Sequence, residues 1–164
     1  MKGRWLLFVL FLLSTNLKAQ EFSKNINFII SIDKEIVAGS IYDFKIIATL
    51  KNSKEKAVKA NYYPGNISMS DADYKLLVSE DIKDVFLSFQ HTEWLSNGNR
   101  KDYNYKIDIK KGWLTHYYYI LYIYNTDKAK YKRMYEPIKG ETFTYEFDSP
   151  NGSMRRVSKV KRTD

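Results

Sequence analysis

Residues 103–109 read Tyr-Asn-Tyr-Lys-Ile-Asp-Ile, with a large apolar or aromatic side chain at every odd position and a polar one at every even position. Side chains two residues apart on an extended chain point the same way, so this order is typical of a strand with one buried face and one solvated face. The same alternation occurs at 42–50, 85–89 and 143–147. A period of two therefore dominates the chain.

The stretch 114–124, Leu-Thr-His-Tyr-Tyr-Tyr-Ile-Leu-Tyr-Ile-Tyr, differs because both of its alternating sets are apolar or aromatic. This pattern predicts a central strand that is covered on both faces. Turn residues such as Pro64-Gly65, Ser96-Asn97-Gly98-Asn99 and Lys139-Gly140 separate the expected strands. Short strands at this spacing, without helical runs between them, predict an all-β fold, an antiparallel sandwich or barrel.

One segment favours a helix over a strand. Ser70 is followed three residues later by Asp73, in the form of a capping box, and Tyr74, Leu77 and Val78 continue at helical spacing. We therefore expect one short helix near residues 71–84.

The arrangement over residues 25–148 resembles an immunoglobulin-like or fibronectin-type-III-like β-sandwich of exported gram-negative bacterial proteins. The resemblance rests on the tyrosine-rich stretch 116–125, which is similar to the tyrosine-bearing penultimate strand of that family. It implies an antiparallel immunoglobulin-like sandwich. It assigns no functional residue, because sandwiches of this type carry many unrelated activities.

The first 19 residues have the three-part order of a secretory signal peptide. Lys2 and Arg4 precede nine apolar residues, 5–13, and a polar stretch then ends at Ala19. We expect residues 1–19 to be removed and the protein to be exported to the periplasm, the outer-membrane surface or the extracellular medium. An uncleaved N-terminal anchor is the alternative, because Leu17, three residues before the cut, is larger than usual.

The charge of the 164-residue chain lies mostly at its ends. Of the net charge of +8, the leader carries three positive charges and residues 155–164 carry a net +4, which leaves only +1 for residues 20–154. We expect one sandwich domain at 20–154 and a basic edge strand or tail at 155–164. A nearly neutral domain argues against nucleic acid as a partner. Membrane contact is expected only through an uncleaved leader or the basic tail.

The side chains that carry most enzyme chemistry are scarce. The chain has no cysteine and two histidines, His91 and His116, and no serine lies in a Gly-x-Ser-x-Gly elbow. Paired acids such as Asp71/Asp73 lie in polar, loop-like stretches that do not raise a carboxyl pKa. The sequence therefore predicts no enzyme, no metal site and no cofactor. An enzyme that brings acids together from distant loops is the third possibility, after two kinds of binding protein.

Aromatic residues are the one unusual feature, because ten of the 14 tyrosines lie between residues 103 and 145. Packing of these rings in a sandwich core is the favoured interpretation. If one strand face is exposed, it is expected to bind another envelope or surface protein, and the alternative is a carbohydrate-binding module that stacks sugars on the rings. The candidate binding residues on this basis are Tyr103, Tyr105, Trp113, Tyr117 and Tyr119.

Overall fold

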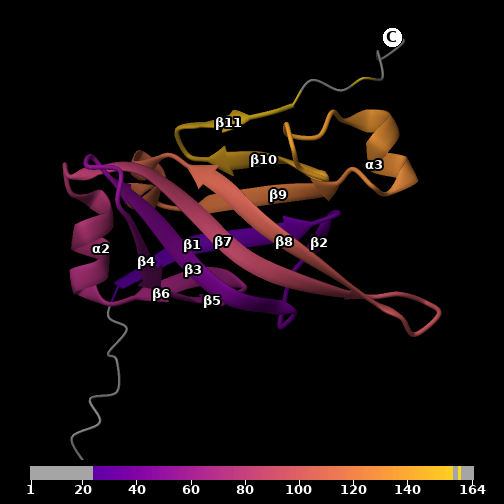
Figure 1. Cartoon of the computed structure of the whole chain (residues 1–164), viewed down its shortest axis with the longest axis horizontal. Helices are drawn as coiled ribbons and strands as arrows, with labels where there is room; N and C mark the ends of the chain where they lie inside the picture. Colours follow the sequence, from indigo (N-terminus) through magenta and orange to yellow (C-terminus); the bar gives the residue numbers. More distant parts are fainter. Residues whose placement is uncertain (1–23, 157–158, 160–164) are drawn as a thin grey trace, which may run out of the picture.

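The computed structural model describes residues 24–156 and residue 159. These residues form two β-sheets around a shared hydrophobic core (Figure 1). The predicted signal peptide, residues 1–19, lies outside the described residues, and so do residues 157–158 and 160–164 of the predicted basic tail.

The larger sheet has seven strands in the order β11-β10-β9-β1-β6-β5, with β2 paired to β1, and the smaller sheet has the order β4-β3-β7-β8. The strands of the larger sheet are β1 (Lys24–Ile32), β2 (Glu35–Ile36), β5 (Asn61–Tyr63), β6 (Gly65–Met69), β9 (Tyr119–Asn125), β10 (Phe143–Ser149) and β11 (Gly152–Met154). Those of the smaller sheet are β3 (Ile41–Leu50), β4 (Glu55–Lys59), β7 (Ile82–Trp94) and β8 (Arg100–Ile109).

The all-β sandwich predicted from the sequence is confirmed, with one correction to the strand directions. β1 and β9 run parallel, in a register that pairs Phe28 with Tyr119 and Ile32 with Ile123, whereas the other strand pairs of the described residues are antiparallel. The larger sheet is therefore mixed. Alternation of side chains reports which face of a strand is buried, and it carries no information on the direction of the neighbouring strand.

The predicted alternation forms the core. On β8 the odd-numbered residues from Tyr103 to Ile109 are buried, and the even-numbered residues between them are exposed. On β7 the residues Val85, Leu87 and Phe89 are likewise buried, and Phe86 and Ser88 between them are half-buried. Because burial of a large apolar side chain stabilises a fold by roughly 1.5–3 kcal/mol, a one-residue slip of either strand would be strongly disfavoured.

The helix predicted near residues 71–84 is present as α2 (Asp71–Val78), and it is shorter than expected. The Ser70 hydroxyl accepts a hydrogen bond from the Asp73 amide at 3.1 Å, as the capping box predicted. The helix ends six residues before Asp84 because Ile82 already pairs with Leu50 as the first residue of β7.

The strand expected at 114–124 begins late. Residues Lys111–Thr115 form a short 3₁₀ helix, η1, and β9 starts only at Tyr119. The Trp113 amide donates to the Lys110 carbonyl at 2.8 Å, which closes the turn. Trp113 and Leu114 are both buried, and consecutive side chains of a strand point to opposite faces. The turn lets both side chains reach the same core.

A second helix, α3 (Ala129–Met134), was not predicted, and it covers the outer face of β9. Tyr131 and Tyr135 lie one helical turn apart, and their ring centroids are 5.3 and 4.7 Å from that of Tyr124. Burial raises the pKa of Tyr124 above its ordinary value. Both faces of the tyrosine-rich strand are thus covered at its C-terminal end.

The larger sheet ends in a short strand that returns along β10. β11 pairs Met154 with Phe147 and Gly152 with Ser149. The Arg155 guanidinium then donates to both carboxylate oxygens of Asp148, at 2.7 and 2.8 Å. The returning strand is thus residues 152–154, and Arg155 and Arg156 of the predicted basic tail follow it.

Candidate binding surfaces

The five aromatic residues proposed from the sequence do not form a common surface. Tyr103, Tyr105, Trp113 and Tyr119 are all buried, whereas Tyr117 is 82% exposed. Tyr117 precedes β9, and Trp113 lies in η1, so neither belongs to the strand on which the expected aromatic face depended. Of the stretch 114–124, β9 itself is thus mostly covered, and the exposed tyrosines, Tyr117 and Tyr118, precede it.

The buried tyrosines join the two sheets. The Tyr105 hydroxyl donates to Oδ1 of Asn125 at 2.8 Å, which links β8 to β9. Its ring lies 5.1 Å from that of Phe89 and edge-on to Phe143 at 5.0 Å. On the far side of the core, the Trp113 ring stacks on Tyr119 at 4.6 Å. These contacts show that the four rings pack in the core and do not form an exposed platform.

A cluster of ionised side chains ties the hairpin formed by β7 and β8 to the larger sheet. Lys128, between β9 and α3, places its Nζ 2.6 Å from Oε1 of Glu93 and 2.7 Å from Oδ2 of Asp33. The Tyr103 hydroxyl donates to the other oxygen of Glu93 at 3.1 Å, and the Asn125 amide donates to Oδ1 of Asp33 at 2.9 Å. Each carboxylate in the cluster therefore has a cationic or hydrogen-bonding partner.

The charge cluster shifts the pKa of its members. Burial raises the pKa of Glu93, but hydrogen bonds from Lys128 and Tyr103 and the positive charge of Lys128 outweigh this and leave it below its ordinary value. Burial lowers the pKa of nearby His91, and the Ser40 carbonyl and the charge of Glu93 offset only part of that effect. At neutral pH, Glu93 is therefore a carboxylate and His91 a neutral imidazole.

The end of the hairpin extends beyond the larger sheet (Figure 1). The amide of Leu95 donates to the carbonyl of Asn99 at 2.8 Å, and the amide of Gly98 donates to the carbonyl of Leu95 at 2.9 Å. Gly98 has a φ of 79°, which glycine adopts without strain. The turn residues recognised in the sequence at 96–99 thus form this tip.

The outer side of the smaller sheet carries two exposed aromatic side chains, one on the hairpin and one on the neighbouring β3. Trp94 is 71% exposed and lies opposite Arg100 in the β7–β8 register, and Tyr42 on β3 is 52% exposed and lies opposite Gln90. A shallow depression of about 400 Å³ lies among these side chains. We call this surface the hairpin face, and its residues are Tyr42, Gln90, Thr92, Trp94, Arg100 and Asp102.

The hairpin face was not identified from the sequence, although a signal for it was present. Alternation with Val85, Leu87 and Phe89 inward places the even-numbered residues of the same strand outward. If the alternation continues beyond Phe89, Trp94 is one of these even-numbered residues and points to solvent. The candidate residues were chosen instead for the density of tyrosines between residues 103 and 145, and four of the five are buried.

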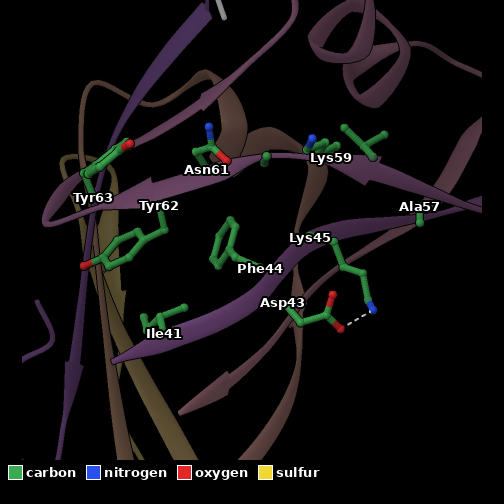
Figure 2. A pocket seen from close by; sticks show the side chains of 11 residues that line it. Ile41, Asp43, Phe44, Lys45, Ala57, Lys59, Asn61, Tyr62 and Tyr63 are labelled. Atoms are coloured by element: carbon green, nitrogen blue, oxygen red, sulfur yellow. Dashed lines mark hydrogen bonds and ion pairs between the residues drawn. The ribbon is translucent and has the colours of Figure 1, made fainter. Parts of the chain in front are cut away.

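A hollow of about 620 Å³ opens where β4 leaves β3 and the chain crosses to β5 (Figure 2). The last β3–β4 pair is Lys45 with Lys59. The rings of Phe44 and Tyr62, 5.7 Å apart, lie in the gap beyond it. The Tyr62 hydroxyl accepts a hydrogen bond from the Ile30 amide at 2.9 Å, and its burial raises the pKa of the phenol. The hollow is thus the seam between the two sheets.

A second hollow, of about 410 Å³, lies between η1 and the β10–β11 hairpin. Trp113, Tyr145 and Phe147 form its apolar part, and Asn151 donates to Nε2 of His116 at 3.3 Å on its rim. The Trp113 and Phe147 rings lie 3.8 Å apart. These three aromatic residues are each 9% exposed, so the hollow reaches only the margins of their rings.

Neither α2 nor α3, the α-helices of residues 24–156, has the length and apolar character needed to span a bilayer. Within the same described residues, His, Asp and Glu side chains do not gather in any group of three that could hold a metal ion. Comparisons with known protein families, with curated proteins and with solved structures find no match to this chain.

Proposed function

We propose that the chain is an exported, non-catalytic binding protein that attaches to another protein of the cell envelope or surface through its hairpin face. The N-terminal pattern of residues 1–19 supports export. A β-sandwich of immunoglobulin-like or fibronectin-type-III-like kind suits such a role, because sandwiches of this architecture present loops and hairpins to many different partners.

The single observation that carries the proposal is the exposure of Trp94 near the tip of the hairpin. A tryptophan that is 71% exposed leaves a large apolar ring in water, and exposed apolar surface at one place marks an interaction site more often than a scattered residue does. Trp, Tyr and Arg are the residue types that contribute most to protein–protein affinity. Trp94, Tyr42 and Arg100 bring all three to one face.

The charge cluster ties the strand that carries Trp94 to the larger sheet. Glu93 and Trp94 are consecutive on β7, so their side chains point to opposite sides of the strand. Glu93 is held from the inner side by Lys128 and Tyr103, and Trp94 is left on the outer side. A partner therefore meets a tryptophan whose neighbour in the chain, Glu93, is held by two side chains, and a backbone position fixed in advance lowers the entropy lost on binding.

The test is affinity purification of the tagged protein from cell envelopes, with Trp94→Ala compared with the parent chain. We expect the variant to lose its co-purifying protein and to keep its stability, because Trp94 is exposed. Ile36→Ala is the matched control, since Ile36 is 63% exposed on β2 of the other sheet and lies outside the hairpin face. An unchanged set of co-purifying proteins in Trp94→Ala would overturn the proposal.

A further inference from the structure

The outer side of the larger sheet carries a second surface, at β5, β6 and β1. The inner side of these strands is apolar, and the residues between the inner ones point outward. Figure 2 shows this directly on β5, where Tyr62 points toward Phe44 and the neighbouring Asn61 and Tyr63 point the other way. We call this surface the amide face, and its residues are Asn25, Asn27, Asn61, Tyr63, Asn66, Ser68 and Tyr118.

The register of the strands places two amides side by side. Tyr63 on β5 lies opposite Asn66 on β6, and Asn66 lies opposite Asn27 on β1. A parallel row runs beside it, from Asn61 through Ser68 to Asn25. Directly opposed residues of antiparallel strands share a face, so both rows point outward.

The first row continues onto the segment that precedes β9. Nδ2 of Asn27 donates to the carbonyl of Tyr117 at 2.9 Å. Phe28 pairs with Tyr119, so the residue before each, Asn27 and Tyr118, are neighbours across the two strands. At about 4.8 Å per strand, the row from Tyr63 to Tyr118 spans roughly 14 Å.

The chemistry of this face is polar and uncharged. Its seven side chains are four carboxamides, one hydroxyl and two phenols. The cation on β1, Lys24, has its Nζ 4.5 Å from the ring centroid of Tyr74 on α2 and so is engaged there. Oδ1 of Asn66 is buried and has no hydrogen-bond partner within residues 24–156. The row itself ends on two exposed tyrosine residues, Tyr63 at 64% and Tyr118 at 40%.

We propose that the amide face binds an uncharged glycan chain that lies across β5, β6, β1 and the start of β9. Carboxamides donate and accept hydrogen bonds at once, as the hydroxyl groups of a sugar do. Tyrosine rings at both ends of the row offer flat apolar faces against which sugar rings pack. A face without charge has no counterpart for an acidic polymer or a phosphate, so the ligand that matches it is neutral.

The test is affinity electrophoresis through native gels that contain a neutral polysaccharide. The protein is purified in the form that the producing cell makes, after any processing. The probes are laminarin, xylan, mannan and amylopectin, and the charged comparators are alginate and polygalacturonate. We expect retardation by at least one neutral polymer and by neither charged one. Added salt is expected to leave this retardation unchanged, because screening acts only on charges.

Two variants place the binding on the amide face. Tyr63→Ala and Tyr118→Ala are each expected to weaken retardation by about two- to tenfold, as expected for the loss of one stacking ring. Ile36→Ala, an exposed apolar residue on the same sheet, is the control and should bind as the parent does. Asn66→Ala leaves both rings in place and should also weaken binding.

The proposal is overturned by a lack of retardation on all four neutral polymers, or by retardation that both tyrosine variants retain in full. Loss of retardation in Trp94→Ala alone would place the sugar on the hairpin face and overturn it as well. Because this readout involves a different sheet from the hairpin face, its failure leaves the partner-binding experiment unaffected.

Discussion

Oε1 of Glu93 lies 2.6 Å from Nζ of Lys128, and this pair fixes the β7–β8 hairpin of the smaller sheet to the segment between β9 and α3 of the larger sheet. The same ammonium group contacts Asp33 at 2.7 Å. One cation thus compensates two carboxylates. The relationship bears on the proposed function because the residue after Glu93 is Trp94, the side chain on which the proposed partner site depends.

Replacement of Lys128 by Met should weaken the attachment of the hairpin. Glu93 and Asp33 would then lie close together without their shared cation. Their side chains are 28% and 12% exposed, between the surface and the buried case, so we expect the free energy of unfolding to fall by about 1–2 kcal/mol. Urea denaturation at neutral pH measures this loss. Lys132→Met, on an exposed position of α3, is the control and should change stability little.

Stability should fall as the solution is acidified below neutrality, in two separate windows. Burial lowers the pKa of His91, so the unfolded chain binds a proton more readily, and stability is lost as pH drops through 6.5 toward the folded value. Glu93 also has a lowered pKa in the fold, and its contribution is lost only below its ordinary value of 4.5. The charged groups near the imidazole are Glu93, Lys128 and Asp33.

The variant His91→Gln separates the two windows. It removes the titrating ring, so the decline that begins at pH 6.5 should flatten, whereas the decline below pH 4.5 should remain. Unfolding midpoints in urea, measured across this range, provide the comparison. A parent chain whose stability does not change between pH 7 and pH 5 would be inconsistent with the burial of His91.

Two buried tyrosines should respond in opposite ways to loss of the hydroxyl group. The Tyr105 hydroxyl bonds Asn125, which is 1% exposed, so Tyr105→Phe leaves a buried acceptor unpaired and should cost about 1–3 kcal/mol. The Tyr119 hydroxyl is buried and finds no hydrogen-bond partner within residues 24–156. Tyr119→Phe should therefore leave stability unchanged or raise it by up to about 1 kcal/mol.

Denaturation curves of the two Phe variants, recorded side by side, test the assignment. Each variant removes one oxygen atom and keeps the ring, so differences in packing volume do not enter. Equal destabilisation by the two changes would show that Tyr119 has a partner that the structure does not reveal.

The capping serine of α2 should contribute measurably to stability. Its hydroxyl accepts from the Asp73 amide and donates to the Asp73 carboxylate at 2.7 Å. Ser70→Ala is expected to lower the free energy of unfolding by about 1 kcal/mol, and Ser70→Asp, which retains an acceptor, should recover most of it. A Ser70→Asp variant as unstable as Ser70→Ala would argue against capping as the cause.

Much of the fold followed from local patterns in the sequence. The strands at 42–50, 103–109 and 143–147 have a clear period of two, and each is a strand in the structure. Ser70 and Asp73 predicted the start of α2, and the turn residues at 96–99 predicted the hairpin tip. In each case the signal lay within a few residues of the element that it specified.

Features that depend on distant contacts were not accessible in this way. The parallel pairing of β1 with β9 joins segments about 90 residues apart, and the alternation of either strand is the same for both directions. The 3₁₀ helix at 111–115 and α3 are five and six residues long, too short for a hydrophobic period to distinguish them from a strand or a loop. Composition alone did not separate buried tyrosines such as Tyr105 from an exposed tryptophan such as Trp94.

The most direct test of the proposed function is photo-crosslinking in the native cell from a benzoylphenylalanine placed at Leu95, beside Trp94 at the hairpin tip, and from one placed at Lys132 on α3. The account predicts a discrete adduct with another protein from position 95, its disappearance when Trp94→Ala is added, and only background from position 132. No adduct at position 95, or the same adducts from both positions, would contradict the hairpin face as the site of partner binding.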